Sequence, residues 1–512
     1  MVGGCMSGKE RDVNTGDLFA QERRETADRS QSHHSSIEAS NDRGAKDGRK
    51  EDQRSEGQSE ASSSAVPTTG KQDEEALWQS HKAQRGVWSE KMLIALERGI
   101  KGGVWFSLID KVCAERTLQL AWERVQSNAG ACGVDGMTVE HFAKDSQSRL
   151  LAVKEHLKGG TYQPKPVKRV YIPKAGSSEK RPLGIPTVTD RVVQAAVKMV
   201  IEPIFEREFG EHSYGFRPGR CCKDALRRVD ELLQSGAVHV VDVDIKGYFD
   251  SIPHPRLMEL VGERIADGRM LKLIESFLKQ GIMEDMGKIE PEEREEGTPQ
   301  GGVISPLLAN IYLNPLDHLM SQSGYAMVRY ADDMVILCHS AKTAETAMAT
   351  LREWSAQAGL ELHPQKTRVV DMGQPKAYFE FLGYRFWRGK TSGRIRRFIR
   401  PKSMKKMREA IKPLTRRTNG ESMNAIVQKL KPRLQGFHNY FKHACASSLA
   451  DVDRWIRVRL RSILRKRAGR RGKGRGLDHH RWPNNYFASL GLFNLEETRK
   501  LELMSLRAAA NF

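Results

Sequence analysis

The feature that most constrains this 512-residue chain is a Tyr-Ala-Asp-Asp stretch at residues 330–333, set between two short apolar runs. The runs, at residues 326–328 and 334–337, predict two strands. The tight acidic break between them predicts a β-hairpin with the carboxylates at its tip. Two adjacent aspartates repel each other and gain little from burial unless a cation lies between them. Asp is also a common turn residue, so this stretch alone is equally compatible with an ordinary turn.

A second acidic strand decides between these interpretations. Side chains along residues 238–245 alternate between two faces, which places Asp242 and Asp244 together on the face opposite the apolar one. A core strand has little reason to carry two carboxylates on one face, although a solvated edge strand is the alternative. If this strand pairs beside the hairpin, Asp244 and Asp332 converge on two divalent ions about 3.5–4 Å apart, as in nucleotidyl transfer. Mg²⁺, which prefers oxygen ligands, is the expected ion.

The charge of the chain indicates its partners. The net charge of +20 favours a polyanion, and nucleic acid is the first candidate. A membrane surface is the alternative, but no segment has the roughly 18 consecutive apolar residues of a spanning helix, so we expect no membrane partner. Residues 1–10 lack a signal-peptide core, and the seven cysteines form no C-x-x-C pair. We therefore expect a cytoplasmic protein with reduced thiols, associated with the nucleoid when it binds DNA.

A basic hairpin is predicted at residues 164–185, where lysines and arginines alternate with apolar residues. Its bases are either solvated or form a phosphate clamp in which Lys174 and Arg181 reach the same triphosphate. Lys366, farther along the chain, is a further candidate for the triphosphate.

Two residues are candidates for contacts with the sugar and base of a nucleotide. Phe249, five residues after Asp244, is placed to lie under an incoming sugar and to exclude a 2′-hydroxyl; the alternative is a core aromatic. Glycines in the loop at residues 297–302 allow close approach of the backbone to a ligand. Gln300 in that loop is a candidate for contact with a base edge or sugar.

Other basic segments are candidates for binding nucleic acid. Residues 430–441 interleave bases with aromatics, and residues 454–481 form a dense basic cluster. Any single arginine there is compatible with simple solvation, but the density favours RNA or DNA contact with strongly salt-dependent affinity. The residues expected to contact nucleic acid are Arg217, Arg433, Tyr440, Arg457, Arg461 and Arg465.

The order of these segments resembles bacterial group II intron-encoded proteins, which are reverse transcriptases that also act as RNA maturases. The resemblance covers roughly residues 90–512. The motifs that carry it are Ile-Pro-Lys at 172–174, Arg-Pro-Leu-Gly-Ile-Pro at 181–186, Tyr-Gly-Phe-Arg-Pro-Gly at 214–219, Asp-Ile-Lys-Gly-Tyr-Phe-Asp at 244–250, Gly-Thr-Pro-Gln-Gly-Gly-Val-Ile-Ser-Pro-Leu-Leu-Ala-Asn at 297–310, Tyr-Ala-Asp-Asp at 330–333, Phe-Leu-Gly-Tyr at 381–384 and Leu-Gln-Gly-Phe-His-Asn-Tyr-Phe at 434–441.

The resemblance implies an α+β fold of the right-hand polymerase type. Fingers and palm, with an antiparallel sheet, would span residues 86–388, and an α-helical thumb or maturase domain residues 389–450. Residues 451–512 would be a basic DNA-binding region. Residues 1–85 are too polar to bury a core, so we expect a disordered extension.

The resemblance also implies a role for each acidic residue of the site. Asp244 and Asp332, with the carbonyl of Ile245, would hold two Mg²⁺ ions, and Asp333 would support the catalytic centre.

The substrate-binding roles implied in the same way belong to residues from separate motifs. Lys174 and Arg181 would hold the triphosphate, Phe249 would be the sugar gate, and Gln300 would touch the nascent base pair.

The implied activity is RNA-directed DNA synthesis from dNTPs, combined with binding of group II intron RNA to assist its splicing. Intron mobility by target-primed reverse transcription, using a DNA target and primer, is expected as well. The sequence ends at Phe512 without the paired-cysteine and histidine endonuclease domain of many relatives, so we expect no nicking of a second strand by this protein. The alternatives are a splicing cofactor with little polymerase activity and a reverse transcriptase adapted to defence or repair.

Overall fold

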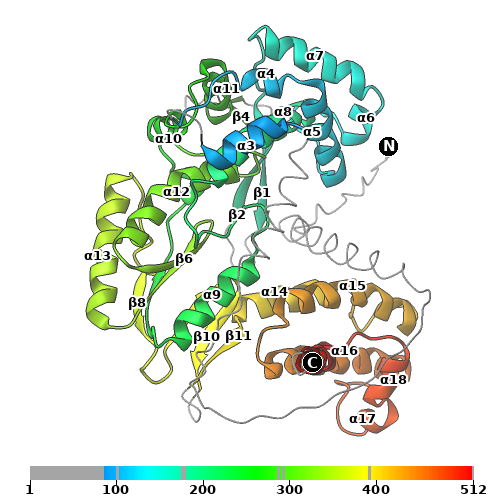
Figure 1. The fold of residues 1–512 in the computed structure, drawn as a ribbon. Helices are drawn as coiled ribbons and strands as arrows, with labels where there is room; N and C mark the ends of the chain where they lie inside the picture. Colours follow the sequence, from blue (N-terminus) through cyan, green and yellow to red (C-terminus); the bar gives the residue numbers. More distant parts are fainter. Residues whose placement is uncertain are drawn as a thin grey trace, which may run out of the picture. The chain divides into compact units, whose positions relative to one another are not determined.

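The residues that the computed structural model describes are 86–99, 103–173, 180–284, 289–290, 295–389 and 394–509 (Figure 1). The extension expected to be disordered, residues 1–85, lies outside the described residues, as does Lys174. Helices and three sheets alternate along the described ranges, which agrees with the predicted mixture of helix and sheet. None of the helices in these ranges is long and apolar enough to cross a membrane.

Helices form the first part of the described chain. The longest of them, α8 (Val188–Glu206), is capped by Thr187, whose hydroxyl accepts a hydrogen bond from the Asp190 amide, as the sequence predicts. Apolar side chains are buried all round α8, which is typical of a helix inside a core. The helices that precede it are α3 (Glu90–Arg98), α4 (Ile109–Val112), α5 (Glu115–Asn128), α6 (Val139–Ala143) and α7 (Ser146–Lys158).

The predicted basic hairpin is confirmed as β1 (Val167–Pro173) and β2 (Lys180–Ile185), which pair antiparallel. Their register places Ile172 opposite Arg181. Two short strands, β4 (Ile282–Met283) and β5 (Ile289–Glu290), complete a sheet of order β2-β1-β4-β5.

A second sheet carries the acidic residues and has the order β6-β7-β3-β8. The predicted hairpin is confirmed as β6 (Ala326–Tyr330) and β7 (Asp333–Cys338), and the predicted acidic strand as β3 (His239–Val243). Strand β3 pairs antiparallel with β7 on one side and with β8 (Arg368–Asp371) on the other. The acidic strand is therefore a central strand that lies directly beside the hairpin.

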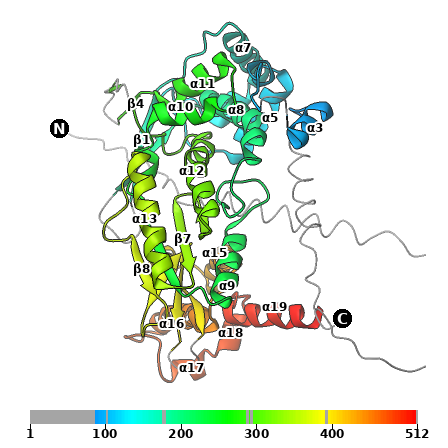
Figure 2. The ribbon, with the colours of Figure 1, turned by 60° about the vertical axis from the view of Figure 1, so that its left-hand side comes forward.

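Two separate cores cover the two faces of this sheet. Val241, Val243 and Ile336 pack in the core that contains α8, and Val240 and Val335 pack in the other. Burial of each such side chain contributes about 1.5–3 kcal/mol, so the register of β3 is strongly specified. Helices α13 and α9 lie on opposite faces of the sheet (Figure 2). The helices of this part are α9 (Cys222–Gln234), α10 (His254–Gly262), α11 (Gly268–Leu278), α12 (Ser305–Gln322) and α13 (Ala341–Gln357), with a 3₁₀ turn η1 (Tyr248–Asp250) after β3.

A third sheet packs, together with C-terminal helices, in the core that contains Val240 and Val335. Its antiparallel strands are β9 (Tyr378–Phe381), β10 (Tyr384–Arg388) and β11 (Ile395–Ile399), with Phe379 and Phe386 stacked at a centroid distance of 4.6 Å. Strand β11 was not expected, because the sequence beyond residue 389 has helical spacing. Its pairing with β10 means that this sheet extends across the boundary predicted between residues 388 and 389.

Helices make up the rest of the described chain. Buried apolar residues of α15 and α16 pack in the same core as the third sheet. Tyr384 in β10 donates a hydrogen bond to the carbonyl of Tyr440, which fixes the sheet against α15. The helices are α14 (Pro401–Ile411), α15 (Met423–Phe441), α16 (Ala446–Arg467), α17 (Asp478–Arg481), α18 (Asn484–Ser489) and α19 (Leu495–Ala509).

Candidate active site

The tip of the β6–β7 hairpin is a two-residue loop made of Ala331 and Asp332. The flanking residues, Tyr330 and Asp333, are the last pair of the ladder. Ala331 has a φ of 58°, in the left-handed region that favours glycine. The β3–β7 register ends at the pair of Val243 with Met334, so Asp244 follows β3 at the same end of the sheet. The strand pairing thus brings Asp244 and Asp332, which are some ninety positions apart in the sequence, to one edge of the second sheet.

Several neighbouring charges act on Asp332. Loss of water on burial raises the pKa of Asp332, and the charge of Asp244 raises it further. The positive charges of Arg181 and Arg329 act in the opposite direction. Arg181 is exposed on β2, so the charge that acts on Asp332 comes from the first sheet.

Asp333 lies on a different side of the tip. Its Oδ2 accepts a hydrogen bond of 3.1 Å from the amide of Leu382, in the turn between β9 and β10. Burial raises the pKa of Asp333 to about 7, with a further contribution from the neighbouring charge of Asp332. Asp333 therefore joins the hairpin to the third sheet.

The other carboxylate of the acidic strand, Asp242, has its own partner. Asp242 Oδ2 lies 3.6 Å from Nε of Arg368 on β8. Burial nevertheless raises the pKa of Asp242 to about 6. Asp242 is thus held in a cross-strand ion pair. Of the two carboxylates, only that of Asp244 lies beyond the end of β3, at the edge of the sheet.

The backbone and side chain of Asp244 are held by the segment before β8. Its carbonyl accepts hydrogen bonds from the His363 amide at 2.8 Å and the Thr367 hydroxyl at 3.1 Å. Its carboxylate pairs with Nζ of Lys366 at 3.2 Å. Lys366, the candidate for the triphosphate, therefore reaches the acidic edge itself.

The donor set at this edge fits a magnesium site that substrate completes. Among the described residues no three His, Cys, Asp or Glu side chains gather closely enough to hold a metal on their own. Asp244 and Asp332 offer carboxylate oxygens, and the residues on either side of Ile245 form the hydrogen bonds of its bridge to Leu362. That pattern leaves the Ile245 carbonyl outside the pairing. Mg²⁺ suits such a site, since it takes one or two carboxylates together with water and substrate phosphates.

Phe249 lies in η1, directly after the acidic strand. Its ring is half-buried beside the first core and packs edge-on against Tyr248 at 5.5 Å. Its carbonyl accepts a hydrogen bond of 2.6 Å from the amide of Thr298. Phe249 is thus anchored by its backbone while part of its ring stays accessible.

The glycine-rich loop joins the first sheet to η1. The Gln300 carbonyl accepts from the Gly184 amide at 2.7 Å, and its side chain donates to Asp250 at 2.8 Å. A Cβ on Gly301, whose φ is +113°, would lie 2.3 Å from the Gly184 carbonyl oxygen. The close backbone approach predicted for this loop occurs, but against the protein's own strand.

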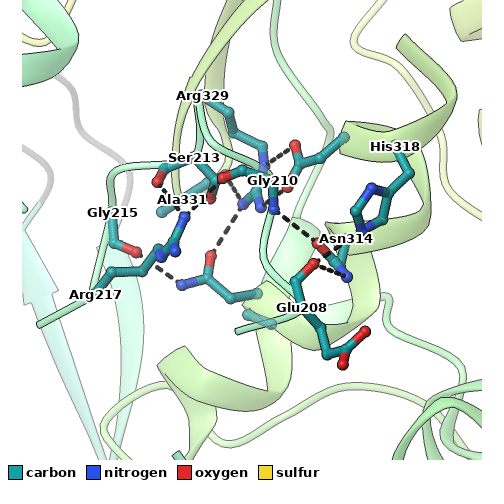
Figure 3. Close-up of polar contacts among 12 residues, drawn as sticks. Glu208, Gly210, Ser213, Gly215, Arg217, Asn314, His318, Arg329 and Ala331 are labelled. Carbon is teal, nitrogen blue, oxygen red and sulfur yellow. Dashed lines mark hydrogen bonds and ion pairs between the residues drawn. The ribbon is translucent and has the colours of Figure 1, made fainter. Parts of the chain in front are cut away.

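The predicted nucleic-acid-binding arginines differ in their surroundings. Arg217 is buried, and its guanidinium pairs with Glu206. It also donates to the carbonyls of Gly210 and Ser213 (Figure 3). The donors of Arg217 thus bind loop and helix within the fold, and its contact with nucleic acid stays a prediction.

Arg461 likewise has its partners within the fold. It is buried and donates to the Trp482 carbonyl and the Asn484 side chain, which fixes the segment after α17.

The remaining candidates keep part of their side chains at the surface. Tyr440 donates to the Leu382 carbonyl at 2.9 Å, and Arg465 pairs with Asp478. Arg433 is exposed and Arg457 is half-buried.

A residue that the sequence analysis did not single out lies just behind the tip. Arg329 is fully buried, and its guanidinium forms an ion pair with Asp317 of α12. It also donates to the Ala331 carbonyl at 3.0 Å. The signal available in the sequence is a single arginine between Val328 and Tyr330 in an otherwise apolar strand.

Comparison with known proteins defines the class as a reverse transcriptase. Residues 172–386 match the family described as "Reverse transcriptase (RNA-dependent DNA polymerase)". Residues 404–482 match a second family, described as "Group II intron, maturase-specific domain". The chain belongs to the group II intron-encoded reverse transcriptase and maturase family.

Individual relatives show how much of the chain the similarity covers. The "Group II intron-encoded protein LtrA" of Lactococcus lactis subsp. cremoris is 42% identical over 205 residues, which are 40% of this chain and 33% of that protein. The "Protein YkfC" of Escherichia coli (strain K12) is 34% identical over 298 residues, which are 51% of this chain and 76% of that protein. The chain thus spans about a third of the length of LtrA and about three quarters of that of YkfC.

Proposed function

We propose that this protein is an RNA-directed DNA polymerase that also binds group II intron RNA and assists its splicing. The observation that carries the proposal is the meeting of Asp244, Asp332 and Arg181 at one edge of the second sheet, where Asp332 is sensitive to both other charges. RNA binding alone would need no such pair of carboxylates. The maturase-specific match at residues 404–482 supports the role in splicing.

The chemistry would depend on charge and position at this edge. Two Mg²⁺ ions, when bound, would supply activation of the primer 3′-hydroxyl and stabilisation of the pyrophosphate leaving group. Asp244 and Asp332, with the Ile245 carbonyl, are the residues that would hold them, and Asp333 would support the hairpin from the other side.

Binding of the dNTP would fall to residues from several elements. Lys366 pairs with Asp244 and the charge of Arg181 acts on Asp332, which supports a role for both in holding the triphosphate, together with Lys174. Phe249 would exclude a 2′-hydroxyl with the accessible part of its ring, which would select deoxyribonucleotides. The Gln300 side chain would give up its hydrogen bond to Asp250 and contact the nascent base pair.

The parts of the chain would then correspond to the subdomains of a right-hand polymerase. The first sheet and its helices would be the fingers, the acidic sheet the palm, and the helices from α14 onward the thumb and a basic DNA-binding region. Exposed bases gather at residues 466–475, at the end of α16 and in the segment that follows it, which supports contact with a DNA target and primer. Intron mobility by target-primed reverse transcription would follow from the two activities together.

The test is primer extension on an RNA template by the purified protein and its Asp332→Asn variant. The wild type is expected to extend the primer, and Asp332→Asn to reduce extension at least about 1,000-fold while its affinity for RNA stays within about twofold. Asn has the size of Asp, and the raised pKa of Asp332 shows that burial disfavours its charge, so the variant is expected to fold. Extension near the wild-type rate by Asp332→Asn would refute the assignment of the site, and a wild type inactive with Mg²⁺ would refute the activity.

A further inference from the structure

Arg329 is buried in a place where the fold alone does not need a charge. It lies on β6, directly before Tyr330, with no exposed surface. Its Nε donates to Asp317 Oδ1 at 2.7 Å, and its Nη2 pairs with the other carboxylate oxygen. Replacement of a buried ion pair by apolar residues of similar volume is often neutral or stabilising. The pair is therefore weak evidence for a role in stability alone, and its remaining contacts show what else it holds.

The remaining contacts of Arg329 lead to the tip of the hairpin. Its Nη1 donates to Asn310 Oδ1 at 2.9 Å and to the Ala331 carbonyl at 3.0 Å (Figure 3). That carbonyl belongs to the peptide that joins Ala331 to Asp332. The guanidinium thus connects the Asp317 and Asn310 side chains of α12 to the carbonyl of Ala331, the residue directly before the catalytic Asp332.

Ala331 needs such support because of its backbone conformation. It is the first residue of the two-residue loop and has a φ of 58°, whereas Asp332 is not among the residues with positive φ. This combination is typical of a type II′ turn, which normally has glycine at the first position. An alanine there is held in an unfavourable conformation by its surroundings.

A loop from a distant part of the chain closes over the same turn. A Cβ on Gly215 would lie 2.3 Å from the Ala331 nitrogen, so only glycine allows this approach. The Gly215 carbonyl accepts a hydrogen bond of 2.7 Å from Nδ2 of Asn310. Asn310 therefore joins Arg329 on one side to the covering loop on the other.

We propose that Arg329 is a positioning residue which, with Asp317 and Asn310, keeps Ala331 left-handed and thereby sets Asp332 in its catalytic orientation. The inference rests on the proposed polymerase function, since it assigns a role in that reaction. It concerns how the carboxylate is placed and not what it binds. Small displacements of a reacting group reduce rates by about 100-fold, so the effect is expected mainly in kcat.

The test uses the full-length double variant Asp317→Asn/Arg329→Gln, which removes both charges together and leaves no unpaired buried ion. In primer extension, kcat is expected to fall about 100-fold while KM for the dNTP changes less than about threefold. Hydrogen exchange is expected to accelerate in peptides that cover residues 329–333 and to stay unchanged in β3. The matched control is Glu259→Gln/Arg256→Gln, which removes an exposed ion pair of α10 and is expected to change neither measurement.

A rescue separates positioning from general damage to the fold. Glycine adopts a positive φ without penalty, so Ala331→Gly added to the double variant is expected to restore kcat at least about tenfold. Unchanged kcat and unchanged exchange in the double variant would overturn the proposal. So would a loss of kcat with accelerated exchange throughout the sheet and no rescue. If the wild type itself fails to extend primers, the proposed function fails, while the exchange of residues 329–333 still tests the positioning.

Discussion

Nζ of Lys366 lies 3.2 Å from Oδ1 and 3.3 Å from Oδ2 of Asp244, so a cation of the protein occupies the carboxylate that is proposed to bind metal. Both side chains are partly exposed, so the pair is weak and exchangeable. Binding of Mg²⁺ at Asp244 would displace the ammonium group. Lys366 would then be available to the triphosphate at the same edge.

This exchange gives opposite predictions for two measurements on Lys366→Gln. Loss of a charge-assisted contact is expected to raise KM for the dNTP about tenfold. Loss of the competing cation is expected to lower the Mg²⁺ concentration at half-maximal extension, or to leave it unchanged. Titrations of dNTP and Mg²⁺ in primer extension check both. Lys279→Gln, which removes an exposed lysine paired with Glu275 on α11, is the control, and an increased requirement for Mg²⁺ in Lys366→Gln would contradict the exchange.

The contact between Gly301 and Gly184 predicts that the glycine-rich loop does not tolerate a side chain. In Gly301→Ala the new Cβ would lie 2.3 Å from the Gly184 carbonyl oxygen, so loop and strand must separate. Because Gln300 pairs with that strand and with Asp250, we expect primer extension to fall at least about tenfold.

Gly324→Ala is the matched control for that variant. Gly324 also has a positive φ, of +74°, but a Cβ there would meet nothing within 4 Å. It therefore carries the strain of a positive φ, about 1 kcal/mol, without the collision. Equal losses of activity in the two variants would show that strain alone, and not the contact with Gly184, explains the effect.

Local patterns were sufficient to predict the acidic edge of the site. The alternation of residues 238–245 and the apolar runs around residues 330–333 are set by the period of a strand, which is visible in a single sequence. The same holds for α8, whose cap at Thr187 and helical period are both local signals.

Contacts between distant segments were not predictable in this way. Strand β11 (Ile395–Ile399) has arginines between its apolar residues, so its sequence alone is typical of a basic segment. Only its pairing with β10 in the folded chain identifies it as a strand. Arg217 and Arg461 resemble surface arginines in sequence, because only the fold supplies the carbonyls and side chains that bind them. Arg329 was overlooked because its partners, Asp317 and Asn310, come from another helix.

The raised pKa of Asp333 predicts a pH dependence of stability. Burial raises this pKa from an ordinary value near 4 to about 7, so the folded state favours the protonated form. The contribution of Asp333 to stability is complete below about pH 4 and is lost as the pH rises through 7. In metal-free protein, Asp333→Asn is therefore expected to become more stable relative to wild type as the pH rises from 4 to 7. Urea unfolding at several pH values measures this, and a difference that is constant with pH would contradict it.

The hydrogen bonds of Asp453 predict how much the docking of α19 on α16 contributes to the free energy of unfolding. Its two carboxylate oxygens accept hydrogen bonds from the amides of Leu495 and Glu496, at 3.2 and 3.0 Å, and so cap the first turn of α19. In Asp453→Ala these amides lose their partners, and we expect the free energy of unfolding to fall by about 1–3 kcal/mol. Asp451→Ala on the same helix removes only an exposed pair with Arg454 and is expected to change it by less than about 0.5 kcal/mol. Urea unfolding of both variants measures the difference, and equal values would show that the cap contributes nothing to the docking of α19.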